Sequence, residues 1–265
     1  MRKSLVVVVA LAVGGFAAGA FADEAAPAAG NVFEASKPPK HSWSFNGPFG
    51  TFDRAALQRG YQVYKEICAN CHTMKYVAFR DLGDPGGPGF EPAEIKALAA
   101  QYTYTDGPND KGEMFERPGL PSDHFKAPFP NEQAARAVNG GALPPDLSLV
   151  ALGREYEHDY IHALLTGYKE APKGLKVPDG KYYNPYYPGG MISMPPPLAP
   201  DAVTFADGTK ATPEQMASDL VTFLAWTADP SLEARHNMGF KVVVFLLVLI
   251  GLFYAVKRKV WAALH

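Results

Sequence analysis

The fold of this chain is decided by the short stretch Cys68-Ala69-Asn70-Cys71-His72. Two cysteines three positions apart, followed directly by histidine, match the attachment motif of a c-type haem. One helical turn presents both thiols to the two vinyl groups of the porphyrin, and the adjacent imidazole reaches the iron. The motif therefore predicts one covalently attached haem c, with Cys68 and Cys71 as thioether sites and His72 as an axial iron ligand.

Other metal and thiol sites fit the sequence less well. The chain has only two cysteines, which excludes four-cysteine zinc sites, ferredoxin-type clusters and a multi-disulfide scaffold. A thioredoxin-like dithiol expects a βαβ setting and gives the following histidine no role. A di-haem peroxidase would need a second Cys-x-x-Cys-His, which the sequence lacks. A gas sensor would need an open or weakly held sixth position on the iron.

A helix is predicted on the N-terminal side of the motif. Asp53 is a suitable N-cap for a helix that begins at Arg54, and Gly60 would let a second helix approach closely. The apolar residues recur at helical spacing. They are Leu57, Tyr61 and Tyr64.

The partner helix is predicted after Thr212, which is followed by Pro213 in the first turn and Gln215 at the third position. Its apolar stripe holds Leu220, Phe223 and Leu224, with Trp226 near the end. Two such helices crossing beside a Cys-x-x-Cys-His predict a mainly α fold with long loops. The fold class expected is a class I cytochrome c-like haem domain with insertions.

The sixth iron ligand is expected from a loop. The stretch from Asn184 to Pro197 is rich in glycine and proline, which favours a rigid extended loop, and Met194 stands directly before its proline run. Met191, three residues earlier, is the rival, and His124 is the bis-histidine alternative. The residues alone leave this choice open.

One further histidine pair has the spacing of some metal sites. His158 and His162 are four positions apart, so a helix would place them on one face. A third ligand is not near them in the sequence, and we therefore expect both to be solvated helix residues.

The N-terminus reads as a secretory signal peptide. Arg2 and Lys3 precede an apolar run from Leu5 to Val13, and the stretch closes on Ala20-Phe21-Ala22. We expect residues 1–22 to be removed and the following domain, residues 23–237, to be exported.

The C-terminus reads as a membrane anchor. Residues 242–256 hold no charged residue, and the basic triplet Lys257-Arg258-Lys259 follows at once, with Trp261 at interfacial depth. Near the other end of the span, Lys241 can extend its ammonium to the interface. We expect residues 238–256 to span the membrane once and residues 257–265 to form a cytoplasmic tail, by the positive-inside rule.

The exported domain is acidic although the chain is nearly neutral. The formal net charge is −2, which excludes a strongly basic protein that coats nucleic acid. Residues 23–237 hold 19 basic against 27 acidic residues, a net charge of −8. Seven acids are candidates for a surface that attracts a basic partner. They are Asp84, Glu91, Glu94, Asp106, Asp110, Glu113 and Glu116.

Beyond the haem motif, several segments resemble the cytochrome c1 family, the haem subunits of the quinol:cytochrome c oxidoreductase (bc1) complex. The resemblance covers the whole mature length. Its segments are Arg117-Pro118-Gly119-Leu120-Pro121-Ser122-Asp123, Pro128-Phe129-Pro130-Asn131-Glu132-Gln133-Ala134-Ala135-Arg136, Asn139-Gly140-Gly141-Ala142-Leu143-Pro144-Pro145-Asp146-Leu147-Ser148, Leu164-Leu165-Thr166-Gly167-Tyr168 and the loop from Asn184 to Pro197.

The resemblance implies a set of haem contacts. The methionine directly before the proline run is the family's axial ligand, which is Met194 here. Arg154 and Tyr160 would bond the haem propionates, with Arg136 as the alternative to Arg154, because the usual glycine pair after that arginine is absent. The implied pocket residues are Asn139, Ala142, Pro144, Pro145, Arg154, Tyr160 and Leu164.

The resemblance also implies the function and partners. One electron at a time would arrive from a Rieske iron–sulfur protein and leave to a soluble or membrane-attached cytochrome c. Cytochrome b would be a further partner in a dimeric complex, and no nucleic acid is expected. The location implied is a bacterial cytoplasmic membrane with the haem domain on the periplasmic side. A free-standing, membrane-tethered cytochrome c shuttle is the alternative.

Overall fold

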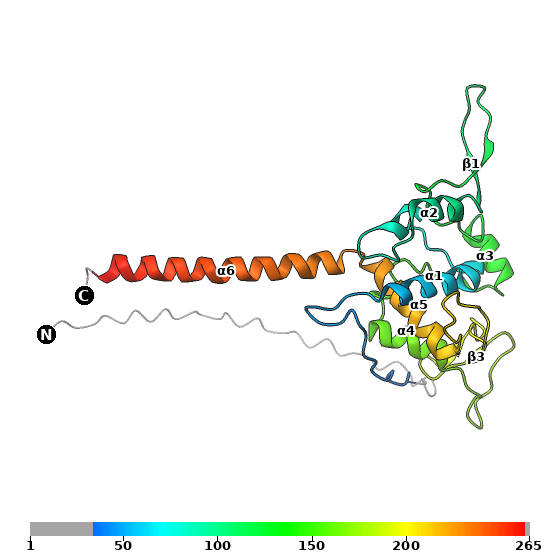
Figure 1. Cartoon of the computed structure of the whole chain (residues 1–265). Coiled ribbons are helices and arrows are strands. Elements are labelled where there is room, and N and C mark those ends of the chain that lie inside the picture. Colours follow the sequence, from blue (N-terminus) through cyan, green and yellow to red (C-terminus); the bar gives the residue numbers. More distant parts are fainter. Residues whose placement is uncertain (1–33, 263–265) are drawn as a thin grey trace, which may run out of the picture. The chain divides into compact units, whose positions relative to one another are not determined.

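The computed structural model describes residues 34–262 and is mainly helical (Figure 1). The predicted signal peptide, residues 1–22, lies outside this range. The elements in chain order are α1 (Arg54–Glu66), η1 (Cys68–Asn70), η2 (Phe79–Gly83), α2 (Pro92–Ala99), β1 (Thr103–Asp106), β2 (Phe115–Pro118), α3 (Glu132–Val138), α4 (Glu157–Thr166), β3 (Tyr182–Tyr183), β4 (Met191–Ile192), α5 (Pro213–Ala228) and α6 (Leu232–Trp261).

Helices α1 and α5 begin at the caps that the sequence predicts. Asp53 Oδ1 accepts hydrogen bonds from the backbone N–H groups of Ala55 and Ala56, at 2.9 and 3.3 Å. Thr212 Oγ1 accepts one from the N–H of Gln215 at 3.1 Å. Each cap satisfies backbone donors that have no partner within the helix, so both start points are fixed by local sequence.

The two helices cross at Gly60, where a side chain would not fit. A Cβ built on Gly60 would come within 2.1 Å of the backbone oxygen of Asp219 on α5. The predicted close approach is therefore confirmed. Beside the crossing, Arg59 Nε and Nη2 bind the two carboxylate oxygens of Asp219 at 2.8 and 2.9 Å. Since Asp219 is buried, this bidentate pair supplies the charge partner that burial requires.

The hydrophobic core lies around this crossing. All of the predicted apolar residues of the two helices are buried: Leu57, Tyr61, Tyr64, Leu220, Phe223, Leu224 and Trp226. The rings of Tyr61 and Tyr64 pack against Phe125 and Phe223, with ring centroids 5.7–5.9 Å apart. The core thus joins the helix before the haem motif to the last helix before the anchor.

The strands form two small antiparallel ladders. β1 pairs with β2 in the register Thr103↔Pro118 to Asp106↔Phe115, and β3 pairs with β4 as Tyr182↔Ile192 and Tyr183↔Met191. The first ladder is the base of a hairpin labelled β1 in Figure 1. The second ladder closes the loop that leads to Met194.

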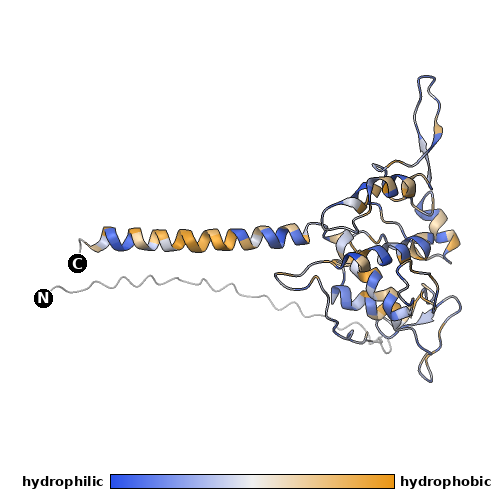
Figure 2. Ribbon diagram, viewed as in Figure 1, coloured by the Kyte–Doolittle hydropathy of each residue, from blue (hydrophilic) through white to orange (hydrophobic). Residues whose placement is uncertain are grey.

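Helix α6 is the one described helix that is long and apolar enough to cross a membrane. It contains the whole predicted span, residues 238–256, and extends beyond it at both ends. Figure 2 shows apolar residues along its middle and polar residues at both ends. No described residue of α6 is buried in the protein, which fits a helix whose apolar surface faces lipid.

The structure corrects one expectation on α4. His162 is only 6% exposed, so the prediction of a solvated residue is wrong. Its ring packs against that of His41 at a tilt of 50°, with centroids 4.1 Å apart, and its Nε2 lies 3.2 Å from Ser218 Oγ on α5. The N-terminal segment packs onto α4 here, because Asp159 accepts hydrogen bonds from the backbone of His41 and from the indole of Trp43.

Candidate haem site

The Cys-x-x-Cys-His motif lies just beyond the C-terminal end of α1. Cys68–Asn70 form the single turn η1, in which the N–H groups of Cys71 and His72 both donate to the carbonyl of Cys68, at 3.1 and 2.8 Å. Asn70 Nδ2 donates to the carbonyl of Glu66 at 3.0 Å and satisfies a free end of α1. The turn therefore displays two free thiols, that of Cys68 half-buried and that of Cys71 exposed.

The environment of Cys68 differs from that of an activated thiol. Desolvation and the neighbouring Cys71 raise the pKa of the Cys68 thiol to about 12. Catalytic and redox-active cysteines instead have a lowered pKa. This site is therefore poorly suited to thioredoxin-like exchange.

His72 has one ring nitrogen fixed and the other available. Its Nδ1 donates to the backbone carbonyl of Pro145, 2.8 Å away. A hydrogen bond from Nδ1 to a carbonyl sets the tautomer with a free lone pair on Nε2, which is the form that ligates metals. Desolvation also lowers the pKa of His72, which favours the neutral imidazole.

Asp146 holds the chain that follows His72 against the segment that carries Pro145. Its carboxylate accepts hydrogen bonds from the hydroxyl of Thr73 at 2.6 Å and from the backbone N–H groups of Lys75 and Ser148 at 3.0 Å each. Desolvation acts to raise the pKa of Asp146, but these hydrogen bonds lower it overall. The ionised carboxylate therefore fixes the carbonyl that orients His72.

The loop that carries Met194 is built on α4. Asn184 is fully buried, and its Nδ2 donates to the carbonyl of Leu164 at 2.8 Å. Its backbone N–H donates to Gly190 at 2.9 Å across the loop. The hydroxyl of Tyr168, just after α4, donates to the carbonyl of Met194 at 3.0 Å. The loop that carries Met194 is therefore held at its start by Asn184 and near its end by Tyr168.

Met191 and Met194 occupy different parts of this loop. Met191 lies in β4, opposite Tyr183, and Met194 lies two residues beyond the end of that strand. Both are half-buried. The position of Met194 outside the ladder, held by Tyr168, suits a ligand whose side chain is free to reach a metal. His124 lies elsewhere, exposed and bridged to Ala78.

The other expected pocket residues come from three segments. Asn139 ends α3, where its Nδ2 donates to the carbonyl of Ala135 at 2.7 Å. Ala142, Pro144 and the more exposed Pro145 belong to the segment that meets His72. On α4, Tyr160 and Leu164 are half-buried, and Leu164 holds the Met194 loop through Asn184.

Arg154 and Arg136, the two propionate candidates, are both exposed. Burial raises the pKa of Tyr160, and the positive charge of Arg154 acts to lower it. Arg136 Nη1 instead donates to the carbonyl of Gly141 at 3.2 Å. Both arginines therefore stay candidates for binding the propionates.

Three residues that position the candidate ligands were not assigned a role from the sequence. They are Asp146, Tyr168 and Asn184. Each was visible only as part of a quoted segment. For Asn184 the sequence does hold a signal, because an asparagine at the start of a glycine- and proline-rich loop can bind the backbone of that loop. Thr73, which Asp146 binds, and Met194, which Tyr168 binds, lie 73 and 26 residues away, so these two contacts leave no mark on the local pattern.

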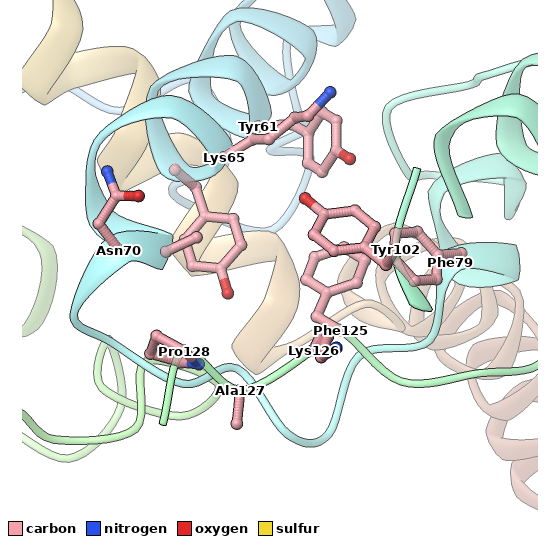
Figure 3. A pocket seen from close by; sticks show the side chains of 11 residues that line it. Tyr61, Lys65, Asn70, Phe79, Tyr102, Phe125, Lys126, Ala127 and Pro128 are labelled. Atoms are coloured by element: carbon pink, nitrogen blue, oxygen red, sulfur yellow. The ribbon is translucent and has the colours of Figure 1, made fainter. Parts of the chain in front are cut away.

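A cavity of about 350 Å³ lies next to η1 (Figure 3). Tyr61, Tyr102, Phe79 and Phe125 form its aromatic walls, and the segment Ala69–Asn70 of the motif contributes to its rim. It contains none of the residues expected to contact the haem. We therefore treat it as distinct from the candidate haem pocket.

The candidate acidic residues are not equally free. Asp106 is paired with Arg117, which also binds Asp123. Glu116 accepts a hydrogen bond from Thr105, and Glu94 bonds the backbone N–H of Glu91 at the start of α2. Asp110 and Glu113 are exposed in the segment that joins β1 to β2. Asp106, Glu116 and Glu94 therefore bind neighbouring groups of the protein, whereas Asp110 and Glu113 face solvent.

The fold and the Cys-x-x-Cys-His turn define the class of haem domains related to cytochrome c and carried on one apolar helix. Residues 43–264 match the model of the cytochrome c1 family. The chain is 47% identical to cytochrome c1 of Rhodospirillum rubrum, over 84% of this chain and 86% of that protein. The chain belongs to the cytochrome c1 family.

Two other relatives extend this comparison. The chain is 52% identical to the protein named cytochrome b/c1 of Bradyrhizobium diazoefficiens, over 86% of this chain. It spans only 36% of the length of that protein. It is 48% identical to the mitochondrial "cytochrome c1, heme protein" of Saccharomyces cerevisiae, over 85% of this chain and 72% of that protein.

Proposed function

We propose that this chain is the one-electron carrier of a bc1 complex, with a single haem c attached at Cys68 and Cys71. The observation that carries the proposal is the η1 turn, which displays two free thiols beside a histidine whose Nδ1 is bound to the Pro145 carbonyl. The donor set fits the group, because two thiols and a neutral imidazole are what covalent haem attachment and axial ligation require. The naming of relatives as heme proteins supports the same assignment.

His72 Nε2 and Met194 Sδ would be the two axial ligands. The bound haem would supply an iron that gains and loses one electron. A methionine ligand raises the reduction potential relative to two histidines. Asp146 and Pro145 orient His72, and Tyr168 and Asn184 hold the Met194 loop. These contacts would hold both ligand positions and so would limit the reorganisation that electron transfer requires.

The remaining contacts would bury the ring and bind its propionates. The expected pocket residues are Asn139, Ala142, Pro144, Pro145, Arg154, Tyr160 and Leu164. An arginine and a phenol at the propionates suit charge-assisted and neutral hydrogen bonds. The apolar members of the set exclude water from the iron, which also tunes its potential.

The electron donor we infer is a Rieske iron–sulfur protein, and the acceptor is a soluble or membrane-attached cytochrome c. Cytochrome b would be the neighbouring membrane subunit in a dimeric complex. The name cytochrome b/c1 of the Bradyrhizobium relative, and its greater length, support an association with a cytochrome b. The net charge of −8 on residues 23–237 supports an acceptor with a basic surface.

The arrangement in the membrane follows from the two ends of the chain. Residues 1–22 would direct export and be removed, residues 23–237 would form the haem domain outside the cytoplasm, and residues 238–256 would cross the membrane. Lys257-Arg258-Lys259 in the tail supports this orientation by the positive-inside rule. In a bacterium the haem domain would then be periplasmic.

Purification in mild detergent and rapid kinetics together test the proposal. A tagged chain is expected to bring down a cytochrome b and a Rieske protein. In that complex, a pulse of quinol should reduce the haem of this chain after the Rieske cluster, and added cytochrome c should reoxidise it. A monodisperse lone subunit that still exchanges electrons with cytochrome c would show instead a free-standing tethered shuttle.

A further inference from the structure

A loop with an apolar tip lies just before α1. Residues 42–52 hold no charged side chain. The tip consists of Pro48 and Phe49, and the Phe49 side chain is 75% exposed. A single exposed apolar residue is ordinary on a protein surface. Phe49 is informative because it lies beside α6, the helix expected to span the membrane.

The tip is held by a fixed base. Phe45 and Phe52 are buried with ring centroids 5.2 Å apart, and the N–H of Thr51 donates to the carbonyl of Ser44 at 3.1 Å. At the turn, Gly47 has a φ of +82°, a conformation that favours glycine. The structure therefore presents Phe49 on a defined loop.

The loop is fastened to the first turns of α6. Glu233 accepts hydrogen bonds from the N–H of Phe52 at 2.8 Å and from Arg54 at 2.7 Å. His236 Nδ1 lies 3.1 Å from the carbonyl of Gly50 and donates to it. One helical turn further along, the Phe49 ring meets that of Phe240 edge to face, with centroids 6.2 Å apart.

Phe240 marks one end of the apolar part of α6. The expected span, residues 238–256, rises by about 27 Å at about 1.5 Å per residue, which is close to a hydrocarbon core of about 30 Å. Aromatic residues gather at both faces of a bilayer. With Lys257-Arg258-Lys259 at the cytoplasmic face, Phe240 lies within one helical turn of the opposite end of the span, and Phe49 lies beside it at the same depth.

We propose that the loop of residues 42–52 inserts its tip, Phe49, into the outer interface of the lipid bilayer. The occupant is lipid because the tip is continuous with the membrane-facing surface of α6, is uncharged, and ends in an aromatic ring. The loop would give the haem domain a second point of contact with the membrane. Two contacts would fix the tilt of the haem domain relative to the membrane plane, whereas a single helix would leave that tilt variable.

The inference rests on α6 spanning the bilayer, and a depth measurement on the holoprotein tests both. Once both native cysteines carry the haem, Phe49→Cys creates a single site for a nitroxide label. The full chain is placed alone in lipid nanodiscs, without other subunits. Collision of the label with oxygen, which concentrates in lipid, is compared with collision with a water-soluble nickel chelate.

Two matched variants calibrate the measurement. Val138→Cys on α3 labels an apolar position that is 71% exposed and far from α6 in sequence, and it reports full exposure to water. Val248→Cys labels the middle of α6 and reports the hydrocarbon core. All three positions are exposed on the protein, so differences between them report the surroundings and not internal packing.

The label at position 49 is expected to collide with oxygen more, and with the nickel chelate at least several-fold less, than the label at position 138. If position 49 behaves like position 138 while position 248 is shielded, α6 is a membrane anchor but the loop does not insert. If position 248 is also open to the chelate, the anchor itself fails and the inference falls with it. An unchanged haem spectrum in each variant verifies folding.

Discussion

At the scale of single residues, Met194 is the ligand that most depends on its loop. Tyr168 holds Met194 through its backbone carbonyl, so a substitution of the side chain leaves that hydrogen bond in place. We expect Met194→Leu to lower the haem midpoint potential by at least about 100 mV, within the about 0.8 V range that axial ligands cover. It should also let carbon monoxide bind the reduced iron, which optical spectroscopy detects.

Met191→Leu is the matched control for this substitution. Met191 lies in the β3–β4 ladder, three residues earlier, and its replacement should leave the potential and the spectrum unchanged. An unchanged potential in Met194→Leu, or a large change in Met191→Leu, would contradict the ligand assignment.

Asp123 supplies a second test at this scale, through pH. Its hydrogen bond with Arg117 is the main cause that lowers its pKa, from 3.8 to about 2. A lowered folded-state pKa means that the pair stabilises fully above pH 3.8 and that this contribution is lost as the pH falls towards 2. The stability difference between the wild type and Asp123→Asn should therefore be largest at pH 5 and shrink towards pH 2. Urea unfolding followed by circular dichroism measures it, and a difference independent of pH would refute the assignment.

Residues whose chemistry is local are the ones that a sequence pattern can predict. The spacing of Cys68, Cys71 and His72 predicts a haem site. The positions of Asp53 and Thr212 directly before a helix predict two N-caps. The burial of His162 was predicted wrongly, because it depends on His41, 121 residues earlier in the chain. The roles of Asp146 and Tyr168 were likewise beyond local reasoning, since their partners come from distant segments.

At the scale of elements, the α1–α5 crossing holds the haem motif in place. Gly60→Ala would push a methyl group to within 2.1 Å of the backbone of α5, and backbone cannot move aside as a side chain can. We expect this change to destabilise the protein by about 3 kcal/mol, the upper end for overpacking a core. Thermal unfolding of the detergent-solubilised chain measures the effect.

Gly239→Ala is the control for the crossing. This glycine is also helical, but nothing lies within 4 Å of its Cβ position. The substitution should leave the melting temperature of the haem domain within error of the wild type. Equal melting temperatures for Gly60→Ala and the wild type would show that the helices do not cross as described.

The elements were predictable to the extent that they are long and capped. α1, α5 and the apolar part of α6 follow from capping residues and periodicity. The ladder of β3 and β4 has two residues in each strand, too few for an alternating pattern to appear. Its existence depends on Asn184 and Gly190 pairing across the loop, which is a property of the folded chain.

At the scale of the whole molecule, charge is divided between an acidic domain and a basic tail. Residues 23–237 carry a net charge of −8, and the segment after residue 237 carries four basic residues and no acids. Long-range attraction should therefore steer a basic cytochrome c toward the acidic domain. We expect the association rate to fall roughly tenfold or more between low and high ionic strength, as stopped-flow mixing would show.

The double variant Asp110→Asn, Glu113→Gln tests whether this electrostatic steering acts through the segment that joins β1 to β2. Both residues are exposed and carry no ion pair that would complicate the substitution. The double variant should react more slowly than the wild type at low salt and equally fast at high salt. A rate that does not depend on salt would remove electrostatic steering from the account.

The central claim, that this family member carries one haem c on Cys68 and Cys71, is tested most directly by a pyridine haemochrome spectrum of the purified chain with its protein content measured alongside. The account predicts the absorption bands of a haem joined through two thioether bonds, with one haem per chain. Bands of a haem without those bonds, or any stoichiometry other than one, would contradict it.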